Sequence, residues 1–501
     1  MTTSSHVMQV EPFGIEPIPD AERNASVLDF IRLQWGGANT LASAMLGAFP
    51  ILFGLSFQQA LLATLLGIIV GALILCPMGI FGPTTGTNNA VSSGAHFGVV
   101  GRIVGSFLSL LTAICFFSLS IWSAGDALVG AFCRIVGMQE SPWLFALAYG
   151  LFALIVLVVC IYGFQFMLLV NKVAVVLASV VFLVGFVAYA DKFDPAFAGA
   201  GMTTDSPEFW PLFIGATLIV MSNPISFGAF LGDWTRYLPR QTGKGKIMLA
   251  SLIAQLCTLL PFVFGLVTMA AIAQYAPEYV ESANYTGGLL AISPLWFFPL
   301  LMLLAVIGGL STGTTALYGT GLDFSSVFPR LSRTQATILI GVLSIAIIFL
   351  GRFAFDLVAS VTTLVTLIIV TTTPWMVVMT LGYLHRRGFY CQDDLQRFNR
   401  GQEGGIYWFY KGWNLRGMLA WIPSALVALL TVNIPGQFVG PWGELAGGLD
   451  ISLLVALLLP AVLYPLLLKL SPEPAAVFGP AQAEPTAAAP RFANQLSPMP
   501  E

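Results

Sequence analysis

The sequence predicts an all-α, polytopic membrane protein with about twelve transmembrane helices. Of its 501 residues, 57% are hydrophobic and only 9% are charged, whereas about 25% charged residues is typical of a soluble domain. The apolar residues form runs of roughly 20, the length that crosses a bilayer as a helix. Two of these runs are interrupted near their middle, which is typical of secondary transporters built from two inverted five-helix repeats.

The spans follow from the apolar runs and from the polar connections between them. The first six begin near Leu28, Phe57, Gly101, Trp143, Phe166 and Phe209, and the second six begin near Ile247, Ala291, Thr334, Phe355, Leu415 and Ile451.

Basic residues predict the orientation. With a cytoplasmic N-terminus, all of the 21 Lys and Arg residues fall on the cytoplasmic side except Arg134, Lys192 and Arg352. Cytoplasmic connections are enriched in basic residues, so this bias favours that orientation strongly. We expect a multi-pass protein of the cell (cytoplasmic) membrane with both termini in the cytoplasm.

The same boundaries divide the chain into segments. The C-terminal stretch is rich in Pro and Ala with few large apolar residues, which predicts a disordered cytoplasmic tail. The segments are a cytoplasmic N-terminal segment (1–27), a ten-helix transporter core (28–384, with repeats at about 28–190 and 209–384), a cytoplasmic loop (385–414), helices 11 and 12 (415–470) and the tail (471–501).

The first span contains a polar, glycine-rich stretch from Gln34 to Thr40, inside the apolar run Leu28 to Gly54. Glycine weakens a helix, and a membrane helix tolerates a break only where the freed backbone groups meet protein or line a cavity. The stretch predicts a discontinuous helix that offers backbone groups to a substrate and ion site. The alternative is a seam of small residues that lets a neighbouring helix approach closely.

The sixth span contains a second interruption, Met221-Ser222-Asn223-Pro224-Ile225-Ser226-Phe227-Gly228. A proline inside a helix removes an amide donor and frees a carbonyl, so we expect the helix to break at Pro224. Proline also kinks ordinary membrane helices. Interruptions at spans one and six together, however, are what two inverted repeats place face to face at the bilayer midplane, and they predict a binding site there.

The eighth span is rich in Gly, Ser and Thr between 308 and 318. Hydroxyls and carbonyls suit a small hard cation. The alternative is that the hydroxyls bond to carbonyls of the preceding turn, which is common in membrane helices. The predicted sodium site combines the carbonyls of Gly37, Thr40 and Gly308 with the hydroxyls of Ser311 and Thr312.

The spans expected to line the cavity carry almost no charge. A charged substrate would need a buried counter-charge, so we expect a neutral, planar, hydrogen-bonding substrate held between aromatic faces and read at its edge by Asn and backbone groups. For any single one of the 38 Phe residues, core packing or lipid contact is the simpler interpretation. The candidate substrate-binding residues are Asn39, Phe116, Phe117, Asn223, Pro224, Ser226 and Phe227.

Other functional classes are disfavoured. The spans contain no HExxH motif, no Ser/His/Asp set and no cluster among only 3 His, so we expect neither an enzyme nor a cofactor. The 6 Cys have no close pair and are expected to be small buried hydrophobes. No basic tract indicates nucleic acid, and no selectivity-filter repeat indicates a channel, although a solute-sensing receptor without flux stays open. The expected partners are a small-molecule substrate and the lipid bilayer, with no obligate protein partner.

Four sets of residues carry a family resemblance. They are Gly14–Pro19 with Glu22-Arg23, Ala38-Asn39-Thr40, Gly232–Tyr237 and Ala316–Leu322. Together they resemble the purine–cytosine permease branch of the nucleobase–cation symport family, over about Val10 to Leu470. The resemblance implies a ten-helix inverted-repeat core of the leucine-transporter type plus two further helices. It also implies alternating access, in which spans one, two, six and seven move against spans three, four, eight and nine.

The resemblance also implies site residues. The family's sodium site matches the five residues named above, and its substrate pocket uses a span-three aromatic residue, a span-six polar segment and a span-eight Asn. This chain has Phe116 where the family often has Trp, Ala113 at the polar position one turn earlier, and Gly313 at the Asn position. Gly313 is therefore included among the candidate substrate-binding residues.

The implied function is a secondary active transporter that imports a neutral nucleobase or related heterocycle of the cytosine/purine class. The coupling ion is sodium or a proton. The alternative is a cation-coupled symporter of another small solute, such as allantoin, hydantoin, or thiamine or a pyrimidine vitamin precursor.

Overall fold

The computed structural model describes residues 11, 13–354, 357–434 and 438–479. Apart from helices, the regular secondary structure of the described residues is one short antiparallel hairpin, β1 (Asn433–Ile434) with β2 (Phe438–Val439). The predicted all-α class is confirmed.

Ten helical segments within the described residues are long and apolar enough to cross a membrane. A broken first span and a shorter apolar helix, α20 (Leu415–Leu430), complete the predicted set of twelve. The long segments are α3 (Phe57–Leu75) with η2 (Cys76–Ile80) and α4 (Phe81–Thr85), α7 (Arg102–Val136), α8 (Pro142–Tyr162), α9 (Phe164–Ala188), α10 (Phe209–Ser226) with α11 (Leu231–Thr235), α12 (Lys244–Cys257) with α13 (Leu259–Tyr275), α16 (Phe298–Val327), α17 (Arg333–Ala354), α18 (Leu357–His385) and α21 (Ser452–Leu470).

Short helices occupy the connections between these segments. The eighth span begins near Leu295 and not at the predicted Ala291. Ala291 belongs to the separate short helix α15, which ends before Pro294. The short helices are α5 (Asn89–Ser92), α6 (Gly94–Phe97), α14 (Glu278–Glu281), α15 (Tyr285–Ile292) and α19 (Gln392–Gln396), with 3-10 turns at Asp20–Glu22, Leu295–Phe297, Phe398–Arg400, Gly443–Ala446 and Ala475–Phe478.

The first span is broken, as predicted. α1 (Val27–Ala38) ends before Asn39, and α2 (Leu41–Leu52) begins after Thr40, whose backbone is extended at φ −144° and ψ 166°. Thr40 caps the second half by accepting a hydrogen bond at its side-chain oxygen from the Ser43 amide at 3.4 Å. The break therefore follows the glycine pair instead of lying on it, because a hydroxyl cap is available there.

The sixth span is also broken, but not at the predicted residue. Pro224 lies inside α10, and the helix ends two residues later, at Ser226. The Pro224 ring packs against Gly71 of α3, where an added Cβ would lie 2.4 Å from the ring. A proline removes one amide donor but lets the helix continue for a short distance. The interruption is the non-helical stretch 227–230 that precedes α11.

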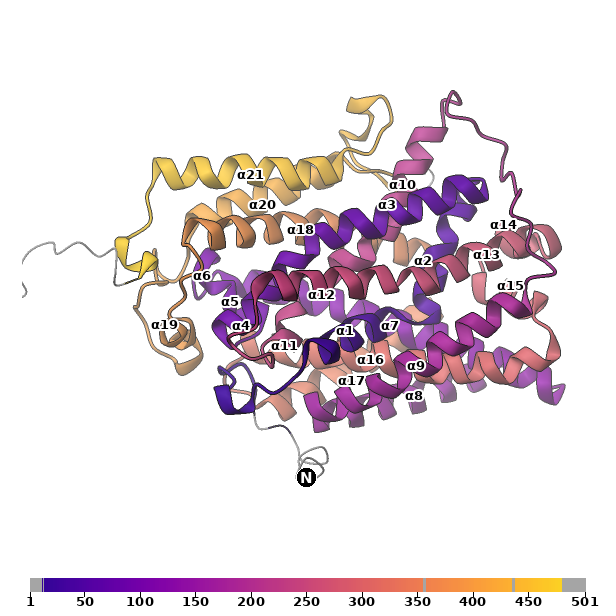
Figure 1. Cartoon of the computed structure of the whole chain (residues 1–501), viewed down its shortest axis with the longest axis horizontal. Helices are drawn as coiled ribbons and strands as arrows, with labels where there is room; N and C mark the ends of the chain where they lie inside the picture. Colours follow the sequence, from indigo (N-terminus) through magenta and orange to yellow (C-terminus); the bar gives the residue numbers. More distant parts are fainter. Residues whose placement is uncertain (1–10, 12, 355–356, 435–437, 480–501) are drawn as a thin grey trace, which may run out of the picture.

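The long helices pack in two groups joined by the broken spans. α3 and α2 pack on α10 and α13, whereas α7, α8, α9 and α17 pack around α16. Figure 1 shows α8, α9 and α17 along one edge and the C-terminal helices α20 and α21 with α18 along the opposite edge. α1 lies against both α12 and α16, so the first span contacts both groups.

The start of the predicted disordered tail is ordered. Residues 471–479 fold back onto the end of α18, and the Glu473 carboxylate accepts hydrogen bonds from Arg386 Nε at 2.8 Å and Asn414 Nδ2 at 3.1 Å. Val477 is fully buried. The Pro- and Ala-rich composition of this stretch gives no indication in the sequence that Glu473 and Val477 hold it against the fold. The remainder of the predicted tail, 480–501, lies outside the described residues, and the division of the core into two repeats at the stated boundaries stays a prediction.

Candidate substrate and cation site

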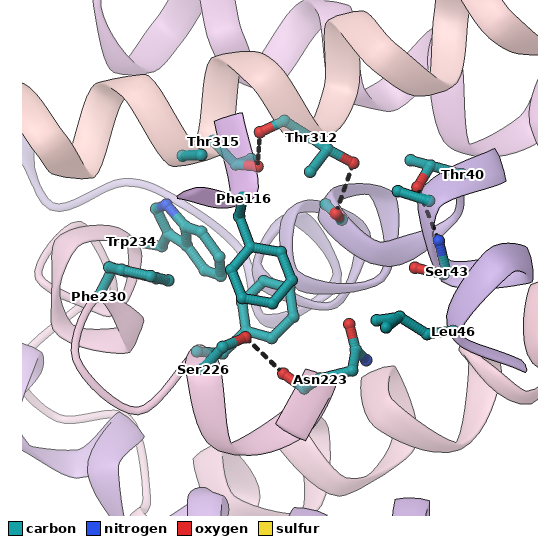
Figure 2. A pocket seen from close by; sticks show the side chains of 14 residues that line it. Thr40, Ser43, Leu46, Phe116, Asn223, Ser226, Phe230, Trp234, Thr312 and Thr315 are labelled. Carbon is teal, nitrogen blue, oxygen red and sulfur yellow. Dashed lines mark hydrogen bonds between the residues drawn. The ribbon is translucent and has the colours of Figure 1, made fainter. Parts of the chain in front are cut away.

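A cavity of about 420 Å³, counting the space open to solvent, lies where the two broken spans meet α7 and α16. Figure 2 shows its lining side chains. None of these fourteen residues, all within the described chain, is charged, which suits a neutral ligand. The lining residues are Gly37, Thr40, Ala42, Ser43, Leu46, Phe116, Asn223, Ser226, Phe227, Phe230, Trp234, Thr312, Thr315 and Ala316.

Aromatic rings form one wall of the cavity. The Phe227 ring centroid lies 5.6 Å from that of Trp234 and 6.4 Å from that of Phe230, with tilted and edge-on geometries. Phe116 enters from α7, and in Figure 2 its ring lies between Trp234 and Leu46. Aromatic faces at several angles can hold a planar ring by stacking and edge contacts.

The polar lining is made of uncharged donors and acceptors. Asn223 is 3% exposed, and its Nδ2 has no hydrogen-bond partner in the described part of the chain. Ser226 Oγ donates to the Asn223 carbonyl at 2.6 Å. A buried amide donor without a partner is costly, so Asn223 is equipped to donate to a ligand carbonyl or ring nitrogen.

Four predicted substrate-binding side chains point elsewhere. Asn39 Nδ2 donates to Val175 O at 3.2 Å and Ser179 Oγ at 2.9 Å, so this amide is hydrogen-bonded to α9 and is not directed into the cavity. Phe117 is fully buried but does not line the cavity, because it lies about 100° around the helix from Phe116. Gly313 faces α8, where an added Cβ would lie 3.0 Å from Val156. Pro224 packs on α3, as described above.

The residues that face the cavity follow helical spacing. On α16 they are Thr312, Thr315 and Ala316, which share one side of the helix. Sequence reasoning found Thr312 but missed Thr315 and Ser43, although both follow a predicted residue by three positions. It also missed Phe230 and Trp234, because nothing in the sequence shows that the non-helical stretch returns to the cavity.

The five predicted cation ligands lie at one contact between the first span and α16. Thr312 Oγ1 donates to the Gly37 carbonyl at 2.8 Å. Gly308 packs directly on Thr40, whose Cα would lie 3.3 Å from an added Cβ. These neutral carbonyl and hydroxyl oxygens are the ligand type that a hard monovalent cation accepts. No group of three or more His, Cys, Asp or Glu in the described residues forms an alternative metal site.

Ser311 reaches across to another helix. Its hydroxyl donates to Asn171 Oδ1 of α9, and Asn171 Nδ2 donates to the Met167 carbonyl at 3.0 Å. By contrast, Thr314 Oγ1 bonds back to the Ser311 carbonyl at 3.1 Å. The back-bonding alternative therefore holds for Thr314 but not for Ser311 or Thr312. Asn171 was missed, although a lone Asn in an apolar span is a signal of a specific contact.

A second cluster joins the N-terminal segment to helices that contribute to the cavity. The carboxylate of Glu11 accepts hydrogen bonds from the Phe164 amide at 2.8 Å, Tyr318 Oη at 3.0 Å and Arg236 Nη2 at 3.3 Å, and also from the Tyr237 hydroxyl. Arg236 and Tyr237 directly follow α11, whereas Phe164 and Tyr318 belong to α9 and α16. We call these five residues the Glu11 cluster. It ties the broken sixth span to the α9–α16 group.

Comparison with known proteins gives consistent matches. A sequence model of permeases for cytosine/purines, uracil, thiamine and allantoin matches residues 17–455. A putative purine-cytosine permease of Bacillus subtilis is 24% identical over 473 residues, covering 92% of this chain and 96% of the relative. A vitamin B6 transporter of Saccharomyces cerevisiae is 26% identical over 305 residues, covering 56% of this chain and 49% of the relative.

A solved structure shares the architecture. It is Mhp1, a transporter of the nucleobase–cation symport 1 family in a closed conformation with bromovinylhydantoin bound. It matches with a TM-score of 0.71 and 18% identity, over 93% of this chain and 97% of that one. At this identity the match shows the fold, and the predicted ten-helix inverted-repeat core with two further helices is confirmed.

Proposed function

This chain belongs to the family of permeases for cytosine/purines, uracil, thiamine and allantoin, and we propose that it imports a neutral nucleobase or a related heterocycle by cation-coupled alternating access. The protein is a multi-pass membrane transporter and not an enzyme. The putative purine-cytosine permease that aligns along nearly its whole length supports the cytosine/purine class.

The observation that carries the proposal is the uncharged, aromatic-walled cavity between the two broken spans. Phe116 and Phe227 flank the ring of the substrate, and Asn223 donates a hydrogen bond to its edge. Trp234 and Ser226 complete the wall. A charged solute would lack a counter-charge among these residues, whereas a nucleobase offers flat faces and several hydrogen-bonding groups.

The coupling cation is proposed to bind beside the substrate. The carbonyls of Gly37, Thr40 and Gly308 and the hydroxyls of Ser311 and Thr312 hold it. Such an ion joins the first span to α16, which links ion binding to the arrangement of the two helix groups. A bound sodium ion replaces the Thr312-to-Gly37 hydrogen bond with two oxygen contacts, and a proton-coupled transporter leaves that bond in place.

A second substrate class is kept because relatives support it. The similar structure holds a hydantoin, and the yeast relative is a vitamin B6 transporter. Both names denote small heterocyclic rings, and the cavity chemistry described above suits them equally. The end of the molecule that carries the Glu11 cluster is proposed to be cytoplasmic, with both termini on that side of the cell membrane.

The test is the thermal stability of the detergent-purified protein against cytosine, adenine, guanine, hypoxanthine, uracil, allantoin, hydantoin, thiamine, hydroxymethylpyrimidine and pyridoxine, each in sodium and in potassium. A ligand of the folded state increases the free energy of unfolding by mass action, by about 2.7 kcal/mol at 100 times its Kd, and the midpoint of thermal unfolding rises with it. Stabilisation by a nucleobase supports the main proposal, and stabilisation by another ring alone supports the second class. Stronger stabilisation in sodium identifies the ion. If no compound raises the midpoint, the proposed substrate class is wrong.

A further inference from the structure

A buried polar contact joins α9 to α16 beside the first span. The Ser311 hydroxyl donates a hydrogen bond to Asn171 Oδ1. Ser311 is 1% exposed and Asn171 is 0% exposed. Gly36 of α1 lies directly against this pair, because a Cβ added there would be 2.7 Å from Asn171 Oδ1 and 3.1 Å from Ser311 Oγ. The contact therefore lies where α1, α9 and α16 meet, one residue before Gly37 of the candidate cation site.

A second hydrogen bond fixes the orientation of the Asn171 amide. Asn171 Nδ2 donates to the carbonyl of Met167, one turn earlier in α9, at 3.0 Å. A flipped amide would lose this bond and would bring two acceptor oxygens together, Oδ1 and the Met167 carbonyl. Asn171 therefore presents an acceptor to Ser311, and the Ser311 proton is directed toward α9.

This contact keeps a nearby helix carbonyl available. A buried Ser or Thr hydroxyl in a membrane helix commonly donates to the carbonyl three or four residues earlier. Gly308 lies three residues before Ser311 and four residues before Thr312. Ser311 donates to Asn171 instead. Thr312 donates to the Gly37 carbonyl at 2.8 Å, a bond that Figure 2 draws as a dashed line. Neither hydroxyl uses the Gly308 carbonyl, which is one of the proposed cation ligands.

We propose that Asn171 is a positioning residue of the cation site, a role that rests on the proposed function. A hydroxyl ligates a cation through an oxygen lone pair, so its proton has to be donated to an acceptor that lies away from the ion. Asn171 Oδ1 is that acceptor for Ser311. It leaves the lone pairs of the Ser311 oxygen and the Gly308 carbonyl for the ion.

The neutral charge of this acceptor matters for transport. An amide oxygen takes the Ser311 proton without bringing a negative charge next to the ion. An ionised carboxylate at the same place would attract a cation much more strongly in a buried site. A transported ion has to leave the site in each cycle, so an amide orders the ligands and still permits release.

The direct test is the thermal stability of the purified full-length protein as sodium replaces choline at constant ionic strength. We expect the midpoint of the wild type to rise with sodium. In Asn171→Ala the apparent sodium Kd should increase about five- to tenfold, because Ser311 then donates back to its own helix. The matched control is Ser344→Ala, which removes a buried hydroxyl that bonds back to the Ile340 carbonyl at 2.7 Å. This control should leave the sodium Kd unchanged.

Asn171→Asp is the conservative variant. Its carboxyl group keeps an acceptor oxygen for Ser311, and in the protonated form it also keeps a donor for the Met167 carbonyl. We expect its sodium affinity to equal or exceed that of the wild type. A lower affinity would overturn the proposal, and this variant decides the question even where the alanine variant does not fold.

A double-mutant cycle separates positioning from a merely structural role. Ser311→Ala removes the hydroxyl that Asn171 orients, so Asn171→Ala should cause no further loss of sodium affinity in that background. Additive losses, or equal sodium Kd values in the wild type and Asn171→Ala, would overturn the proposal. A wild type without sodium dependence would overturn it together with the proposed sodium site. If the heterocycle panel fails while the cycle gives the expected result, the substrate class is rejected and the role of Asn171 stands.

Discussion

Glu11→Gln is expected to loosen the Glu11 cluster without altering any residue that lines the cavity. The Glu11 side chain is 8% exposed and Arg236 is fully buried. One carboxylate oxygen, Oε1, accepts from Arg236 and Tyr318, while the other, Oε2, accepts from the Phe164 amide. Glutamine has one acceptor oxygen, so the variant can satisfy either the α11–α16 side or the α9 side, but not both.

The magnitude follows from these contacts. Breaking a buried ion pair by removing one charge costs about 3–5 kcal/mol, and the retained hydrogen bonds of the amide recover about 1 kcal/mol. We therefore expect the contacts of the Glu11 cluster to lose about 2–4 kcal/mol, which raises the population of molecules with this cluster opened about 30- to 900-fold. Arg236 contributes most of this loss, because its guanidinium keeps its charge in a buried position.

Hydrogen exchange of the purified full-length protein measures the effect. Amides of residues 13–26 and 231–238 should exchange faster by the same factor in Glu11→Gln, since local opening governs their exchange. The matched control is Glu16→Gln in the same segment, because Glu16 is exposed and, within the part of the chain that the structure describes, accepts only from the Gly14 amide at 2.9 Å. Equal exchange in the two variants would show that Glu11 does not link the helix groups.

The remaining predictions concern the cavity and the C-terminal contact. Thr312→Ala removes the hydroxyl that donates to Gly37 and should weaken sodium-dependent stabilisation at least about tenfold, whereas unchanged sodium dependence in the thermal-shift panel would place the ion elsewhere. Asn223→Ala removes the unpartnered cavity donor and should weaken heterocycle binding about five- to tenfold by calorimetry, and unaltered affinity would contradict its role. Glu473→Gln breaks a fully buried pair with Arg386 and should cost about 3 kcal/mol of stability, with the exposed Glu444→Gln as control. Burial raises the pKa of the Glu473 carboxyl, but Arg386 and Asn414 lower it by more, so its pKa lies below the ordinary value. The contact therefore stabilises the wild type above pH ~4.3 and is lost as the pH falls further through the lowered pKa, which thermal unfolding at several pH values would show as a loss absent from the variant.

The sequence predicted those site residues whose chemical type is unusual in a membrane span. It missed those residues that reach the cavity only because of how the helices pack. Gly37, Thr40 and Thr312 were identified because carbonyls at a helix break and hydroxyls in an apolar span are unusual choices. Asn39 is equally unusual, yet its amide is used by α9. Residue type shows that a polar group must find a partner, but only the rotation of the helix decides which partner it finds.

The two helix breaks illustrate the same limit. Interruptions in spans one and six could be read from Gly, Asn and Pro, because these residues weaken or truncate helices locally. Their positions could not, since one break lies at the hydroxyl cap of Thr40, and the other follows Pro224, which stays inside α10 and packs on Gly71.

By itself, the sequence determined the class, the number of spans and the neutral character of the cavity, because the bilayer imposes length, hydropathy and the cost of charge on every segment separately. The tertiary structure alone decided which residues meet across the chain. It brought Glu11 to Arg236, Glu473 to Arg386 and Asn171 to Ser311. Contacts between residues hundreds of positions apart depend on how whole helices pack, and no local pattern of residues encodes that arrangement.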